Sequence, residues 1–63
     1  MALNTKTEGT QLYEIEITRK GQKEREWLSV YAKNRLDASN FLILNKIYGK
    51  QHIIREHIAG SIK

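Results

Sequence analysis

The chain has no cysteine, and its 63 residues include only two histidines. No disulfide can therefore hold the fold together, and a tetrahedral zinc site would lack ligands. The core must stabilise the fold without such crosslinks, alone or with the help of a partner chain. A lack of cysteine also fits a reducing compartment.

Long hydrophobic runs are missing as well. No run approaches the roughly 18 apolar residues that a membrane-spanning helix needs, and the first residues, MALNTKTEG, lack the apolar region of a signal peptide. These two absences predict a cytoplasmic protein without a membrane partner. A chain of this length forms one domain at most and buries only about 60% of the surface that its unfolded form exposes, so we expect no deep catalytic cleft.

Motifs for catalysis and for phosphate binding are also absent. The sequence contains no GxxxxGK[ST], GxGxxG, HExxH or GxSxG, and its four glycines are isolated from one another. His52 and His57 are five residues apart in a predicted strand, so they would point to opposite faces and could not ligate one metal ion. We therefore predict no metal, no cofactor and no small-molecule substrate.

Glu14 and Glu16 are the carboxylates to consider as a catalytic pair. They would lie about 7 Å apart on one face of a strand. Acid–base catalysis needs a carboxylate whose pKa is shifted in an enclosed site, and the open face of a small sheet offers no enclosure. We predict that both are surface charges able to pair with Arg25 across a hairpin, and that the protein is not an enzyme.

Residues 12–18 and 24–32 alternate apolar and polar side chains, as half-buried strands do, and Gly21 between them predicts a hairpin turn. The period changes at Asn34, which can cap a helix over residues 35–48 that ends before Gly49. The apolar arc of this helix is wider than one small sheet needs, so part of it is available to something else.

A third alternating run predicts a strand at residues 51–58. The chain then reads as a flexible arm at residues 1–10 and a single α+β domain of ββαβ order at residues 11–63. A right-handed crossover places the third strand beside the first, which gives a three-stranded antiparallel sheet in the order 2-1-3 with the helix on one face. The predicted core consists of Tyr13, Ile15, Ile17, Leu28, Val30, Ala32, Ile54 and Ile58 from the strands and Ala38, Phe41, Leu44 and Tyr48 from the helix.

Trp27 and Tyr31 would stand on the sheet face away from the helix, beside two glutamates. Trp and Tyr are enriched at the centres of protein interfaces, and the carboxylates would repel the phosphates of a nucleic acid stacked there. The alternative is that Trp27 packs locally on Lys or Arg side chains. The residues predicted to bind a protein partner or a second copy of the chain are Trp27, Tyr31 and Ile43.

The formal net charge is +4, and residues 19–35 carry +4, against −2 in residues 1–18 and +2 in residues 36–63. Such a chain meets nucleic acids, acidic proteins and anionic membranes more often than a neutral one does. A basic hairpin can contact phosphates, although exposed turns are also Lys-rich for solubility alone. The candidate nucleic-acid-binding residues are Arg19, Lys20, Lys23, Arg25, Lys33 and Arg35.

In size and general style the chain resembles the accessory proteins of phages and mobile elements, which are short, poor in cysteine and act by binding a larger component. The comparison rests on size and style and not on a motif, because a W-x-x-V-x-A strand followed by a capped helix that ends in Tyr-Gly occurs in many unrelated small domains. The resemblance transfers no functional residues. We predict a regulatory or adaptor protein that binds another protein or itself, with a nucleic-acid-binding module as the alternative; only the latter would lose affinity steeply as salt rises.

Overall fold

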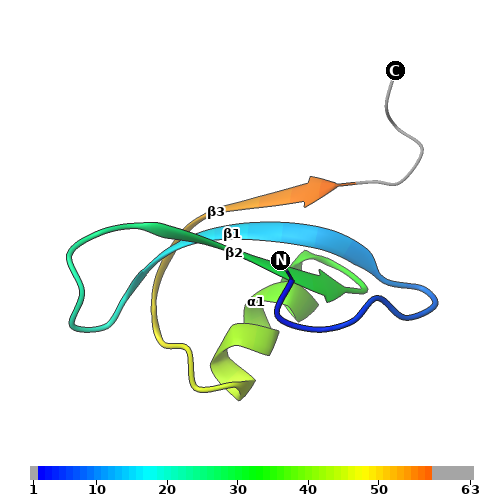
Figure 1. The fold of residues 1–63 in the computed structure, drawn as a ribbon, viewed down its shortest axis with the longest axis horizontal. Helices are drawn as coiled ribbons and strands as arrows, with labels where there is room; N and C mark the ends of the chain where they lie inside the picture. The colour runs from blue at the N-terminus through cyan, green and yellow to red at the C-terminus, as the bar shows by residue number, and fades with distance from the viewer. Residues whose placement is uncertain (1, 58–63) are drawn as a thin grey trace.

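Three antiparallel strands form one sheet in the order β2-β1-β3, and a single helix packs against one face of it (Figure 1). The computed structural model describes residues 2–57. In chain order the elements are β1 (Gln11–Arg19), β2 (Glu26–Ala32), α1 (Arg35–Leu44) and β3 (Gly49–His57). The predicted α+β class, ββαβ order and strand order are confirmed. Between residues 2 and 57, no helix is long and apolar enough to cross a membrane.

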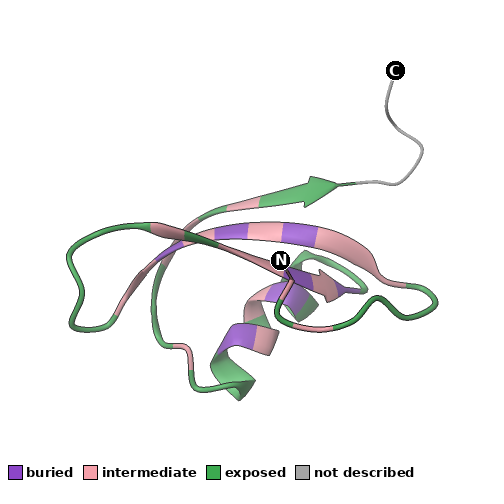
Figure 2. Cartoon of the chain, viewed as in Figure 1, coloured by how far each residue is buried: buried purple, intermediate pink, exposed green. Residues whose placement is uncertain are grey.

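The core lies between α1 and the inward face of the sheet, where alternate strand residues meet the helix (Figure 2). The buried strand residues are Tyr13, Ile15, Ile17, Val30 and Ala32. Leu28 of β2 and Ile54 of β3 are partly buried against them. These parts of the predicted core are confirmed, whereas Ile58 lies outside the described residues.

The hairpin between β1 and β2 turns at Gly21, as predicted. The backbone N–H of Gln22 donates to the carbonyl oxygen of Arg19 at 2.9 Å, and Gly21 has a φ of 87°. This is the geometry of a type II turn, in which the third residue favours glycine. Because β2 begins only at Glu26, residues 20–25 form a loop that projects beyond the sheet (Figure 1).

The helix packs on the sheet through a different stripe from the one predicted. Ala38 and Leu42 are buried and Phe41 packs against the core, whereas Leu44 is 80% exposed and Tyr48 is 53% exposed. The prediction was therefore wrong for Leu44 and Tyr48, and Leu42 occupies the core instead. Three short strands offer a helix a narrow contact, and residues four apart, such as Ala38 and Leu42, suffice to fill it.

The helix begins where predicted but ends four residues earlier. At its start, the Asn34 side-chain oxygen accepts a hydrogen bond from the backbone N–H of Asp37 at 2.8 Å, so Asn34 is the N-cap. At its end, Asn45 is the C-cap and Lys46 has a left-handed φ of 63°, which stops the helix. Gly49, which was predicted to terminate the helix, is instead the first residue of β3.

A β-bulge at His52 interrupts the pairing of β3 with β1. The His52 Nε2 atom lies 2.8 Å from the Thr18 hydroxyl oxygen on β1. On the helix side, the Gln51 side-chain oxygen accepts a hydrogen bond from the Ser39 hydroxyl at 2.6 Å. The first half of β3 is therefore joined to both the sheet and the helix through polar side chains.

Residues 2–4 lie against β2, although a flexible arm was predicted for this part of the chain. The backbone N–H of Leu3 donates to the Ser29 carbonyl oxygen at 2.7 Å. The Asn4 side chain donates to the Tyr31 carbonyl oxygen at 2.9 Å and accepts from the Tyr31 N–H at 2.8 Å. These contacts occupy backbone groups on the side of β2 that faces away from β1, and they shield that edge of the sheet.

Candidate interaction surfaces

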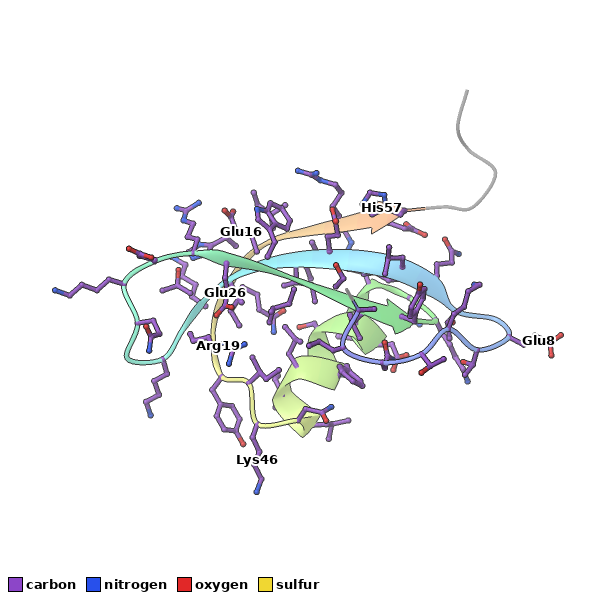
Figure 3. The ribbon with its side chains drawn as sticks, in the orientation of Figure 1. Glu8, Glu16, Arg19, Glu26, Lys46 and His57 are labelled. Carbon is purple, nitrogen blue, oxygen red and sulfur yellow. The ribbon has the colours of Figure 1, made fainter. Side chains whose placement is uncertain are left out.

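The sheet face opposite α1 is polar and crossed by ion pairs. Glu14 of β1 is 2.8 Å from the His57 ring nitrogen and 3.8 Å from the Arg55 guanidinium, both on β3. Glu16 is 3.4 Å from Arg25 at the hairpin, which is the pairing expected from the sequence. Both glutamates are therefore held in surface ion pairs, and Figure 3 shows Glu16 on the side of the sheet away from α1.

Trp27 lies on this polar face and has an internal partner. The Arg55 guanidinium lies over its ring, 4.8 Å from the ring centroid, at a distance typical of a cation–π contact. Trp27 nevertheless keeps 44% of its surface exposed. The local packing considered as an alternative thus exists, and it leaves part of the indole open to a partner.

Tyr31, the second predicted aromatic of this face, is less available. Its backbone is held by Asn4, and the Lys6 ammonium lies 5.9 Å from its ring centroid. The side chain is only partly exposed. Residues near the N-terminus therefore cover the end of the sheet face where Tyr31 lies, and the two aromatics do not form one open patch.

The largest apolar exposure is on the outer side of α1. Leu36 is 71% exposed, Ile43 is 48% exposed and Leu44 is 80% exposed. Ile43 and Leu44 follow Leu36 by seven and eight residues, which is about two helical turns, so the three side chains lie on one side of α1. At about 100° per residue, this side is opposite to the buried residue Ala38. Figure 2 shows buried segments of α1 separated from one another by intermediate and exposed ones.

This outer stripe, consisting of Leu36, Ile43 and Leu44, includes one of the predicted binding residues. Ile43 was expected at the edge of the polar strip, and the structure places it among exposed apolar neighbours. Leu36 and Leu44 were missed because a sequence with apolar residues on both sides of a helix does not say which side meets the sheet. The excess width of the apolar arc was the signal that could have found them.

The predicted basic cluster is divided in the structure. Arg19 pairs with Glu26 at 2.6 Å, and Arg25 pairs with Glu16 at 3.4 Å, so the two arginines of the hairpin are partly neutralised. Lys33 and Arg35 follow β2, and its seven residues place them about 20 Å from the hairpin at about 3.3 Å per residue. These six residues therefore do not form one surface.

Lys50 and the α1–β3 connection, rather than Lys33 and Arg35, lie beside the hairpin. The backbone N–H of Lys20 donates to the Tyr48 carbonyl oxygen at 2.8 Å, which brings the α1–β3 connection against the turn. Lys50 pairs with Thr18 at the end of β1. Lys46 projects from the same connection, away from the sheet (Figure 3). Sequence reasoning missed these residues because they are far from the hairpin along the chain.

In residues 2–57 no group of three His, Cys, Asp or Glu side chains could hold a metal ion. A shallow depression at the hairpin is lined by Arg19, Gln22, Glu24, Arg25 and Glu26. Within this lining Arg19 pairs with Glu26, whereas Arg25 pairs with Glu16 on β1.

No protein-family model, curated protein or solved structure matches this chain. Its function has to be argued from its own surfaces. Two of them stand out: the apolar outer stripe of α1, and the lysine-rich end beside the hairpin.

Proposed function

We propose that the protein is a small non-enzymatic regulatory or adaptor protein that binds another protein through the outer stripe of α1. The observation that carries the proposal is the exposure of Leu36, Ile43 and Leu44 on the helix side opposite the core. A soluble domain of this size gains nothing in folding from three large apolar side chains in water. Contiguous exposed apolar side chains mark interaction surfaces, and helices with anchors two turns apart are a recurring recognition element.

The charges around the stripe favour an acidic partner over a second copy of the chain. Lys33 and Arg35 lie at the start of α1 and Lys46 lies just after its end. Asp37, in the first turn, accepts a hydrogen bond from the backbone N–H of Lys33, just before the Asn34 N-cap. In a dimer formed through α1, either orientation of the two helices would bring basic ends together, which opposes association.

The partner that fits is therefore a protein with an apolar groove rimmed by Asp and Glu. Trp27, Tyr31 and the polar sheet face are secondary in this proposal, because ion pairs and residues near the N-terminus cover much of that face. Binding a larger component in the cytoplasm is also how the phage and mobile-element accessory proteins act, and the proposal places this chain in that functional class.

The test compares capture by the unmodified protein with capture by Leu36→Gln combined with Leu44→Gln. We expect the double variant to fold, because both side chains are exposed, and to lose a stoichiometric protein from extracts of the cells that make it. Leu3→Gln is the matched control, since Leu3 is 44% exposed but lies beside β2. The captured protein is then purified and titrated against each variant by calorimetry.

The proposal fails if the purified partner binds the double variant as tightly as the unmodified protein. It also fails if Leu3→Gln weakens binding equally, because the effect would then reflect general stickiness. Sedimentation of the unmodified protein over a wide concentration range tests whether a second copy of the chain covers the outer stripe instead. A dimer that Leu44→Gln abolishes would overturn the choice of an acidic partner.

A further inference from the structure

Two segments that meet at the hairpin end of the molecule carry four lysines and an exposed tyrosine. Lys20 and Lys23 lie in the hairpin turn, Lys46 lies in the α1–β3 connection, and Lys50 lies at the start of β3. The hydrogen bond from Lys20 N–H to the Tyr48 carbonyl oxygen joins the two segments. Tyr48 stands between Lys46 and Lys50 in the sequence, and its side chain is 53% exposed.

This end also carries the excess positive charge of residues 2–57. Six basic and three acidic residues belong to it. The basic ones are Arg19, Lys20, Lys23, Arg25, Lys46 and Lys50, and the acidic ones are Glu16, Glu24 and Glu26. The rest of the described chain has four basic and four acidic residues and is balanced. Since the arginines are paired with Glu26 and Glu16, the lysines supply the charge that is left for a ligand.

We propose that Lys20, Lys23, Lys46, Lys50 and Tyr48 form a binding site for single-stranded nucleic acid. Lysine ammonium groups contact phosphates as point charges without reading sequence. An exposed tyrosine ring can stack on an unpaired base, which a duplex does not offer because its bases are already stacked. The site consists of the hairpin loop and the segment leading into β3, which the Lys20–Tyr48 backbone hydrogen bond joins, and a flexible single strand can pass from one to the other. An acidic protein would use the charge but has no bases for the ring.

This site is distinct from the outer stripe of α1, and its test does not depend on the proposed protein partner. The probe is a fluorescent oligothymidylate of about 12 nucleotides, a length that matches the few bases such a site could cover. Anisotropy gives the affinity as a function of salt. Lys20→Gln combined with Lys50→Gln should lower the slope of log affinity against log salt by about 1.4, because each contact to a single strand contributes about 0.7.

The matched control is Lys6→Gln combined with Lys33→Gln, which removes the same charge elsewhere on the protein and should leave the slope unchanged. Tyr48→Leu should weaken binding of the oligonucleotide at least fivefold at an unchanged slope, and Tyr48→Phe should retain affinity because the ring is kept. Circular dichroism confirms that each variant is folded. The Leu36→Gln, Leu44→Gln variant should bind the oligonucleotide normally.

Three results would overturn the proposal. No binding at low salt would remove the site. An equal effect of the two lysine pairs would reduce it to attraction by net charge. If Tyr48→Leu had no effect and polyglutamate competed as well as the unlabelled oligonucleotide, the lysine end would be a surface for acidic proteins rather than for nucleic acid.

Discussion

The Arg55 guanidinium on β3 lies 4.8 Å from the centre of the Trp27 ring on β2, so the Arg55 side chain crosses the intervening strand β1. The same guanidinium is 3.8 Å from the Glu14 carboxylate on β1. One side chain therefore connects all three strands on the face away from α1. This contact explains how a tryptophan can be tolerated on a polar sheet face, since Arg55 covers part of its ring.

The first prediction is that Trp27 and Arg55 are energetically coupled. In a double-mutant cycle with Trp27→Ala and Arg55→Gln, we expect a coupling of about 0.5–1 kcal/mol in the free energy of unfolding, the range for exposed cation–π pairs. Both single variants should remain folded, because Trp27 is 44% exposed. Urea denaturation gives the four stabilities, and strictly additive effects would show that the contact contributes nothing.

The second prediction concerns the side of α1 that meets the sheet. Leu42 is fully buried, whereas Leu44, two residues later, is 80% exposed. Leu42→Ala should therefore destabilise the protein by about 2–5 kcal/mol, enough to unfold much of so small a domain. Leu44→Ala should change stability by less than about 0.5 kcal/mol. Thermal melts of the two variants decide between them, and the reverse order would restore the helix orientation predicted from the sequence.

The strands could be predicted from the sequence, but the helix orientation could not. Alternation in β1 assigns Tyr13 and Ile15 to one face without ambiguity, because a strand has only two faces. In α1, apolar residues occur on nearly every side. The sequence is therefore compatible with two rotations of the helix about its axis, one that buries Leu44 and one that buries Leu42. The choice depends on how the helix crosses the sheet, which is a tertiary property.

The third prediction is that Gly49 tolerates no side chain. A Cβ atom there would overlap the carbonyl oxygen of Thr18 and the Cα of Arg19, both backbone atoms of the paired strand β1. Gly49→Ala should therefore destabilise the fold by more than Gly21→Ala. At Gly21 a Cβ would meet nothing within 4 Å, and only the positive φ costs about 1–2 kcal/mol. Equal losses in denaturation experiments would mean that β3 shifts easily away from β1.

The same strand pairing explains why the basic surface was only partly predictable. Adjacent residues such as Lys20 and Lys23 share a loop, so the sequence reveals them together. Lys50 lies beside the end of β1 only because β3 returns beside β1. Lys33 was included for its proximity in sequence, but β2 carries it to the opposite end of the sheet.

The fourth prediction is an alkaline loss of stability that depends on Tyr13. Burial raises the pKa of the Tyr13 hydroxyl above its ordinary 10.0, and the negative charge of Glu56 and a hydrogen bond to it act in the same direction, against the charge of Arg35. Above about pH 10 the unfolded chain loses this proton while the folded protein keeps it. The folded state then binds more protons than the unfolded chain. The free energy of unfolding therefore falls as pH rises, whereas at lower pH it does not depend on this group.

Urea midpoints measured across this range should decline less steeply for Tyr13→Phe than for the unmodified protein. Tyr48→Phe, which changes an exposed ring, is the control and should decline like the unmodified protein. If Tyr13→Phe declined just as steeply, the alkaline loss of stability would have to come from groups other than Tyr13.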